Sequence, residues 1–137
     1  MKVLLKQPKQ HSIAIEFSNK GEETLCALQA LVGGYIEIAT VQHVDGLGTV
    51  AILCDEDFLF KETKRPITNS LNVGEGNKWR VYGAAVMVKL RETKDSKEFF
   101  GFNFEDEVQK AIKWLDSLDF TRQEMWRKLG NNDHEEI

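Results

Sequence analysis

The chain has 137 residues, of which 42% are hydrophobic and 29% are charged, and this is typical of one globular domain with its own core. The formal net charge of −4 disfavours a general nucleic-acid-binding protein but leaves room for a local basic site. The apolar runs are too short to span a bilayer, and the N-terminus has too little charge and hydrophobicity for a signal peptide. We therefore expect a cytoplasmic protein that makes no membrane contact.

Two short strands are predicted at the start of the chain. Met1–Gln7 has the pattern of a strand, and Ser12–Phe17 alternates, with two isoleucines and a phenylalanine on one face. Pro8–His11 lies between them as a turn. The two segments therefore predict a β-hairpin whose second strand is half-buried.

A helix and a strand follow directly. The helix is expected to begin near Glu22, where acidic side chains favour a helix N-terminus, and to end at Gly33–Gly34. Tyr35–Val41 is rich in β-forming residues and predicts a strand. The glycine pair favours a helix cap, and a ligand-cradling loop is the alternative. The apolar face of the helix consists of Leu25, Leu28, Leu31 and Val32.

The middle of the chain returns as a second hairpin and then becomes irregular. Asp45–Gly46 predicts a turn, and Thr49–Cys54 predicts the returning strand. The acidic run Asp55–Asp57 is expected to be a solvated turn, because a metal-binding loop would need alternating oxygen ligands and a distant acid. Lys61–Lys78 has few apolar anchors and is expected to be a long loop.

Trp79–Leu90 predicts the last long strand. Its side chains are largely apolar on both faces, so we expect a central strand that is covered on both sides. Arg91–Glu98 is nearly all charged or polar and is expected to be an exposed hairpin tip. Of the four phenylalanines in Phe99–Phe104, we expect some to pack on the sheet and one or two to stay exposed. Asn103 and Asp106 resemble a helix cap, which predicts a helix to about residue 118. Its predicted apolar face consists of Val108, Ala111, Ile112 and Leu115.

The predicted fold class is α+β, with a mainly antiparallel sheet, one short covering helix and two C-terminal helices. A capping box at Thr121 begins the second of these helices. The predicted domain spans residues 1–130, with the sheet and its helix in 1–90 and a helical hairpin in 103–130. Residues 131–137 are expected to form a disordered polar tail.

Motifs for catalysis or metal binding are missing from the sequence. No cysteines and histidines have the spacing of a metal site, and no serine or cysteine lies in a recognisable nucleophile motif. We therefore expect a protein that is not an enzyme and has no catalytic residue, metal ligand or cofactor. Cys26 and Cys54 are expected to be reduced and buried, although a disulfide between them stays open.

Recognition is the remaining class of function. Arginines hold phosphates, and aromatic rings stack on bases. We expect Phe102 and Asn103 to contact a base, and Arg122 and Arg127 to contact phosphate. The ordinary alternative is surface arginines and core aromatics. The predicted ligand-binding residues are Arg80, Tyr82, Phe102, Asn103, Arg122 and Arg127, with Trp79 as a further aromatic.

Three stretches carry a family resemblance: LQALVGGYIEI, DGLGTVAILCDED and VYGAAVMV, with Pro66 in the loop before the last. They resemble phage and mobile-element proteins known as domain-of-unknown-function family 3846. The resemblance covers Met1 to Leu90 and implies a phage or prophage origin, but that family has no assigned activity to carry over. The order of sheet and helices is also similar to that of phage anti-Thoeris sponges, which sequester cyclic ADP-ribose-type signals.

Three hypotheses follow. The first is a non-enzymatic, homo-oligomeric anti-defence protein that sequesters a nucleotide-type immune signal, cyclic ADP-ribose-like or a cyclic nucleotide, in the host cytoplasm. The second is a protein–protein inhibitor of a host defence or replication protein, which would use the phenylalanines and Arg91–Glu98 as its contact surface. The third and weakest is a single-stranded nucleic-acid binder that uses Trp79 and Arg80. The net negative charge of the chain disfavours this hypothesis.

Overall fold

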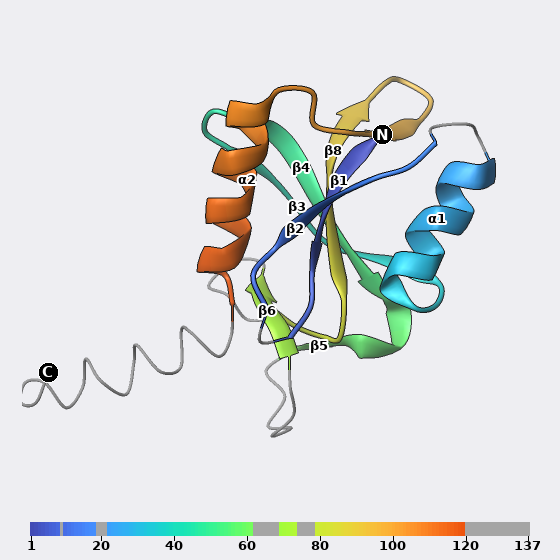
Figure 1. Ribbon diagram of the computed structural model, residues 1–137. Helices are drawn as coiled ribbons and strands as arrows, with labels where there is room; N and C mark the ends of the chain where they lie inside the picture. Colours follow the sequence, from blue (N-terminus) through green and yellow to red (C-terminus); the bar gives the residue numbers. More distant parts are fainter. Residues whose placement is uncertain (9, 19–21, 62–68, 74–78, 120–137) are drawn as a thin grey trace, which may run out of the picture.

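Figure 1 shows the chain in a computed structural model, which describes all residues except 9, 19–21, 62–68, 74–78 and 120–137. In the described part, a six-stranded antiparallel sheet lies between helix α1 (Glu22–Val32) and helix α2 (Glu105–Ser117), which cover opposite faces. A smaller, three-stranded sheet lies at one end of it. The predicted α+β class with a mainly antiparallel sheet is therefore confirmed.

The large sheet has the strand order β2-β1-β8-β4-β3, with β9 also paired to β8. β4 occupies one side of β8, while β1 and β9 share the other side, one after the other along its length. β2 and β3 therefore lie at the two ends of this path, while β9 lies off the path and pairs with β8. The strands are β1 (Lys2–Lys6), β2 (Ile13–Glu16), β3 (Ile36–Val44), β4 (Gly48–Asp55), β8 (Ala85–Glu92) and β9 (Lys97–Phe100).

Alternation of side chains divides the core into two clusters, one on each face of the sheet. On β1, β4 and β8, Leu4, Ile52 and Met87 face α2, while their sequence neighbours on the same strands face α1. The expected central strand with two covered faces is confirmed for Ala85–Leu90, which is β8 without its last two residues, Arg91 and Glu92. Within α2, the predicted apolar face is confirmed by Val108, Ala111 and Leu115, all of which are buried.

Both predicted hairpins are confirmed. β1 pairs with β2, and β3 pairs with β4 through a turn in which Gly46 has a φ of +84°. The end of α1 is also as predicted, because Gly33 has a φ of +91° and its N–H donates to Gln29 O at 2.8 Å. Leu25 does not face the core, however. It is 52% exposed, and the buried positions of α1 are Leu28 and Val32.

Two predictions about residues 61–90 are wrong. The expected long strand breaks at Gly83, whose φ of +78° is a conformation that glycine adopts most readily. β7 (Trp79–Tyr82) before the break joins the smaller sheet between β5 (Leu59–Lys61) and β6 (Asn69–Val73), while β8 follows the break in the large sheet. The expected loop contains β6, whose alternating apolar side chains, Leu71 and Val73, are buried.

The cap predicted for α2 is also wrong. Phe104 occupies the N-cap position without a side-chain cap hydrogen bond, and Glu107 instead accepts the N–H of Asn103 at 3.2 Å. The short 3₁₀ helix Glu56–Phe58 likewise replaces part of the expected acidic turn. The predicted second helix from Thr121 and the predicted tail lie outside the described residues.

The C-terminal end of α2 is held to the first hairpin by buried polar groups. Asp116 accepts hydrogen bonds from the Ser12 N–H at 2.8 Å and the Ser12 hydroxyl at 2.6 Å, and His11 Nδ1 lies 3.1 Å from its other oxygen. Burial would raise the pKa of Asp116, but these hydrogen bonds outweigh burial and lower it. Two residues past the helix, Asp119 pairs with Lys6 at 2.7 Å, and the Lys6 side chain is 1% exposed.

The Lys6–Asp119 pair gives a first prediction. Asp119→Ala leaves the Lys6 ammonium buried without its carboxylate, so it should destabilise the fold by about 3–5 kcal/mol in urea unfolding. The double variant Lys6→Met, Asp119→Leu removes both charges and should recover most of that loss. A double variant as unstable as Asp119→Ala would show that the pair contributes through packing rather than through charge.

Asp116 gives a second prediction, on acid unfolding. Because its folded pKa is lowered, its contribution is complete above the ordinary carboxyl pKa and is lost as the pH falls toward the folded value. Ser12→Ala should therefore cost about 1.5–3 kcal/mol at pH 7. The difference in unfolding free energy between Ser12→Ala and the unmodified protein should become smaller as the pH falls below about 4. Ser96→Ala, in an exposed turn, is the control and should show a pH-independent effect.

Candidate functional site

Phe102 and Asn103 are the predicted ligand-binding residues that the structure brings together. They lie between β9 and α2, whereas Arg80 and Tyr82 lie on β7, beyond the opposite end of β8 (Figure 1). Tyr82 is 3% exposed, so its ring belongs to the core. The side chain of Trp79 and the whole of Arg122 and Arg127 lie outside the described residues.

A pocket of about 380 Å³ opens where β1 and β9 meet on the side of β8. We call it the β1–β9 pocket. It combines the start of β1, the end of β2, the end of β9 and the segment that leads into α2. Its lining residues are Met1, Lys2, Glu16, Phe100, Gly101, Phe102 and Asn103.

Backbone packing at Gly101 creates the junction. A Cβ on Gly101 would lie 2.6 Å from Lys2 N and 2.7 Å from Lys2 O, so a larger residue would push β1 away. The next residue then pairs with β1, because the Phe102 N–H donates to Lys2 O at 2.9 Å. The chain therefore crosses from β9 to α2 in direct contact with the start of β1.

The rim of the pocket carries polar side chains that can bind a ligand. Lys2 and Glu16 are directly opposite each other on β1 and β2 and share a face of the sheet, and in the described part they form no ion pair. Asn103 is exposed, and Glu107 holds its backbone N–H. Its side-chain amide makes no hydrogen bond within the described residues. The rim thus offers an ammonium, a carboxylate and an amide.

The two phenylalanines of the pocket have different environments. Phe102 is 3% exposed and packs in the core on the α2 side of the sheet, so its ring forms the floor of the pocket. We expected this ring to contact a base, but its burial leaves it unavailable for stacking. Phe100 is half-buried, with Arg91 Cζ at 4.9 Å and Lys89 Nζ at 5.7 Å from its ring centre. Lys89 is also bound to Glu107 of α2. An aromatic ring with bound cations therefore stands beside the pocket.

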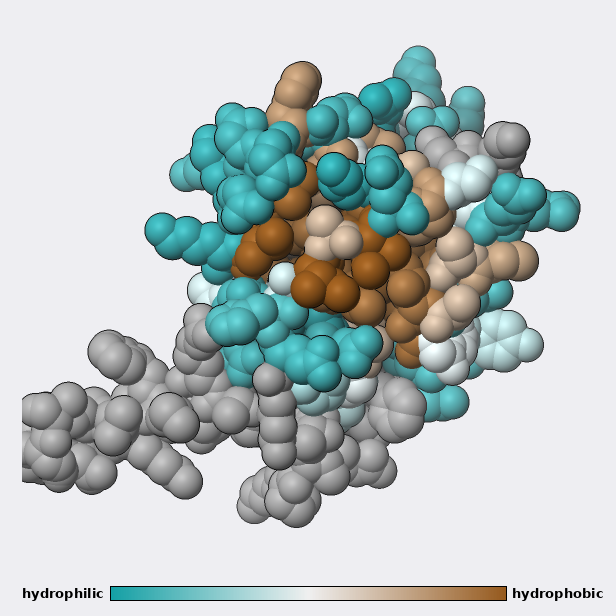
Figure 2. All heavy atoms as spheres, viewed as in Figure 1, coloured by the Kyte–Doolittle hydropathy of each residue, from teal (hydrophilic) through white to brown (hydrophobic). Residues whose placement is uncertain are grey.

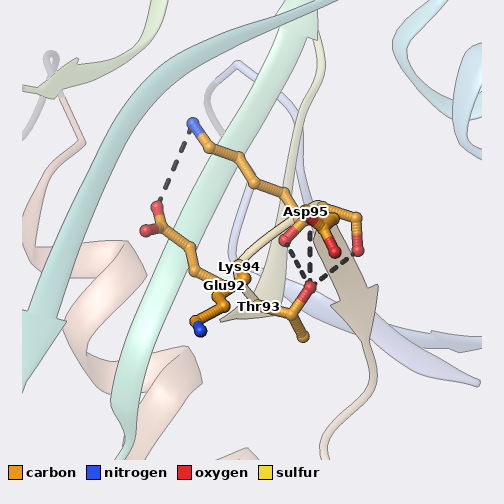
Figure 3. A pocket seen from close by; sticks show the side chains of 6 residues that line it. Glu92, Thr93, Lys94 and Asp95 are labelled. Carbon is orange, nitrogen blue, oxygen red and sulfur yellow. Dashed lines mark hydrogen bonds and ion pairs between the residues drawn. The ribbon is translucent and has the colours of Figure 1, made fainter.

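The charged excursion Arg91–Glu98 forms the exposed β8–β9 turn that we predicted. A hollow of about 270 Å³ lies on this turn. Figure 3 shows the side chains that line it, among them Glu92, Thr93, Lys94 and Asp95. Thr93 Oγ1 lies 2.9 Å from Ser96 Oγ and 3.1 Å from Ser96 O, and Lys97 lies 4.0 Å from Glu92. These groups bind one another, so we attribute the hollow to the internal contacts of the turn and not to a ligand site.

A third hollow, of about 330 Å³, lies between α1 and β3 at Gln29, Ala30, Gly34 and Tyr35. The Asp55 carboxylate lies beside Gly34 and Asp55 is buried, which contradicts the expected solvated turn at this residue, whereas Glu56 and Asp57 are exposed as expected. A Cβ on Gly34 would lie 2.5 Å from Asp55 Oδ2, so this glycine makes room for the carboxylate, which accepts the Asp57 N–H at 2.9 Å. The second glycine of the pair therefore serves close packing.

The thiols and the remaining titratable groups are dispersed. Both cysteines are free; Cys54 is buried as expected, but Cys26 is exposed. Burial, helped by Glu37 and Asp55, raises the pKa of the Cys54 thiol to about 12. Among the residues that the structure describes, no three His, Cys, Asp or Glu side chains are grouped closely enough to hold a metal ion. None of the helices in the described ranges has the length and hydrophobicity of a membrane-spanning segment.

A comparison with protein families places this chain. Residues 1–108 match the model of the family described as a domain of unknown function, DUF3846, and the chain belongs to that family. The match extends beyond the expected Leu90 and includes β9 and the start of α2, so it contains every residue of the β1–β9 pocket. No curated protein and no solved structure matches the chain.

The thiols give a third prediction. At pH 8, Cys26 should react with iodoacetamide at the rate of an ordinary exposed thiol, while Cys54 should stay unmodified because its pKa is about 12 and its side chain is buried. Mass spectrometry of the native protein should show one carbamidomethyl group per chain, and the urea-unfolded control should show two. Two groups on the native protein would contradict the burial of Cys54.

Proposed function

We propose that this member of the DUF3846 family is a non-enzymatic protein of phage or mobile-element origin that binds and sequesters a small nucleotide-type immune signal in the β1–β9 pocket. Binding without turnover would lower the concentration of the signal below the level that its receptor needs. The role is that of an anti-defence factor inside the host cell.

The observation that carries this proposal is the composition of the pocket rim. The Lys2 ammonium, which forms no ion pair with the described residues, and the exposed Asn103 amide lie around one concave surface, together with a carboxylate from Glu16. Ligand sites combine concavity with a small number of placed polar groups. The volume of about 380 Å³ is near the lower end of the roughly 300–1,000 Å³ typical of such sites. A mononucleotide or cyclic mononucleotide therefore fits this pocket better than a dinucleotide.

Each group has a role in this proposal. Lys2 attracts the phosphate as a point charge. The Asn103 amide, which has both a donor and an acceptor, pairs with a base edge, and Glu16 accepts a hydrogen bond from a sugar hydroxyl or an exocyclic amine. Phe100 contributes a half-buried ring to the lining, while the buried ring of Phe102 forms the floor.

A second candidate function is inhibition of a host protein by direct contact. The specific observation in its favour is Phe104, which is 68% exposed at the start of α2. Phenylalanine is one of the residue types that are enriched at protein interfaces. Phe104 does not line the β1–β9 pocket, so substitutions can separate the two functions.

Calorimetric titration with 5′-mononucleotides, cyclic mononucleotides and cyclic ADP-ribose tests the first function. At least one should bind, and Lys2→Ala and Asn103→Ala should each weaken binding by about tenfold or more, because each removes a hydrogen bond to the ligand. Lys94→Ala removes the same charge from the exposed turn and should leave the affinity unchanged. Phe104→Ala is a second control.

Two results would count against the first function. One is the absence of binding heat with every nucleotide at millimolar ligand. The other is an equal loss of affinity in Lys2→Ala and Lys94→Ala, which would indicate a general effect of charge. Capture of a stoichiometric host protein that Phe104→Ala abolishes would instead support the second function.

A further inference from the structure

The edge strand β2 has an exposed apolar surface. Ile13 is 52% exposed, Ala14 is exposed and Ile15 is half-buried. Figure 2 views the molecule from the side of β2, where hydrophobic side chains form a continuous area between polar borders. The strand lies between α1 and α2 in this view, and neither helix covers it (Figure 1).

Hydrogen bonds at the start of β1 show which backbone groups of β2 face outward. Met1 N donates to Phe17 O at 2.7 Å, and Phe17 N donates to Met1 O at 3.0 Å, so these two residues form a hydrogen-bonded pair. Such pairs alternate along an antiparallel ladder. Ile15 and Ile13 are therefore bonded to β1, and the N–H and C=O groups of Ala14 and Glu16 point away from the sheet.

Ala14 and Glu16 are the two residues of β2 whose backbone N–H and C=O groups point outward. Ser12 comes next in the alternation, but its N–H is already bound to Asp116 of α2. Within the described residues, Ala14 and Glu16 have no hydrogen-bond partner for their outward backbone groups. A strand edge with free donors and acceptors and an apolar face is a template for another strand.

We propose that β2 pairs with β2 of a second copy of this chain, antiparallel, about a two-fold axis at Ile15. Ala14 then pairs with the partner's Glu16 and Glu16 with the partner's Ala14, and four backbone hydrogen bonds use all the outward groups. On the α1 side of the sheet, Ile15 meets its own copy, and Ile13 meets the partner's Phe17. The result is a continuous sheet across both copies.

The neighbouring registers are less favourable. An axis at Ala14 would pair Glu16 with the partner's Ser12, whose N–H is held by Asp116. An axis at Glu16 would place two glutamates directly opposite each other, which destabilises a strand pair. Only the axis at Ile15 satisfies the outward groups and keeps like charges apart.

The opposite edge of the sheet is less suited to this pairing. β3 is longer, but its pairing with β4 shifts register between Ile38 and Thr40. Such a bulge twists an edge strand and interrupts the regular spacing of its outward groups. β2 has a continuous register from Lys2–Glu16 to Leu5–Ile13. Of the two end strands, β2 is therefore better suited to pair with a second copy, and the proposed dimer uses it.

The β2 dimer does not depend on the proposed ligand binding, although the β2 edge and the β1–β9 pocket are adjacent. Glu16 lines the β1–β9 pocket with its side chain and joins the partner with its backbone. Antiparallel pairing about an axis perpendicular to the sheet keeps both α2 helices on the same face. The two pockets therefore open on that face, one on each side of the shared strands. A pairing of so few residues is a small interface, so the dimer should dissociate on dilution.

Ala14→Pro tests the proposal directly. Proline removes the outward N–H of Ala14 but no bond to β1, and prolines are tolerated at such edge positions. In sedimentation equilibrium, the unmodified protein should shift with concentration from the chain mass of 15.7 kDa to twice that mass. Ala14→Pro should remain monomeric with an unchanged circular dichroism spectrum. Ala14→Val keeps the N–H and should dimerise like the unmodified protein.

Hydrogen exchange supplies a measurement that does not depend on the folding of a variant. In the unmodified protein, the amides of Ala14 and Glu16 should exchange at least about tenfold more slowly at high than at low protein concentration. The amides of the opposite edge should not change with concentration. An unmodified protein that stays monomeric at millimolar concentration would overturn the proposal, and so would a dimer in which these two amides exchange at a concentration-independent rate.

Discussion

Two strands that are distant in sequence have to share one side of β8. β1 covers Ala85–Met87 and β9 covers Lys89–Glu92, so the chain after β9 must cross the start of β1 at once. Gly101 allows this crossing because it has no Cβ to meet the Lys2 backbone. The crossing leaves a concave surface, the β1–β9 pocket, and aims the chain toward α2. The pocket is thus a consequence of how the sheet is completed.

β1 is therefore the strand to which α2 is fastened at both ends. At the start, Phe102 is bound to Lys2, and at the far end Asp119 is paired with Lys6. Asp116 fastens the same helix to Ser12, just before β2. These contacts hold β2 in place from one side and leave its other side open. The exposed edge and the pocket therefore arise from the same arrangement of β1, β2 and α2.

Local patterns predicted the elements that depend on local physics. Alternation in Ile13–Phe17 and Ala85–Leu90, the glycine at the end of α1 and the apolar face of α2 all gave the right structure. The break at Gly83 was missed because apolar residues continue on both sides of it. β6 was missed because its buried positions, Leu71 and Val73, stand among polar residues. The burial of Asp55 depends on Gly34, 21 positions earlier, and no local pattern shows such a contact.

The candidate site was predictable only in part. The density of phenylalanines drew attention to Phe102 and Asn103, and the structure places both at the pocket. Lys2 and Glu16 were missed because only the pairing of β1 with β2 brings them to the same place. A glycine between phenylalanines, Gly101, was the one local signal of a close backbone crossing. Arg80 belongs to the smaller sheet, since the chain changes sheets at Gly83.

The most direct test of the pocket is backbone-amide NMR of the isotope-labelled protein during titration with the mononucleotide that binds most tightly. If the pocket is the binding site, the largest shifts should fall on Lys2, Glu16 and residues 100–103, with little change on β5, β6 and β7. Shifts centred on the smaller sheet or on the β8–β9 turn, with none at Lys2 and Asn103, would contradict the account.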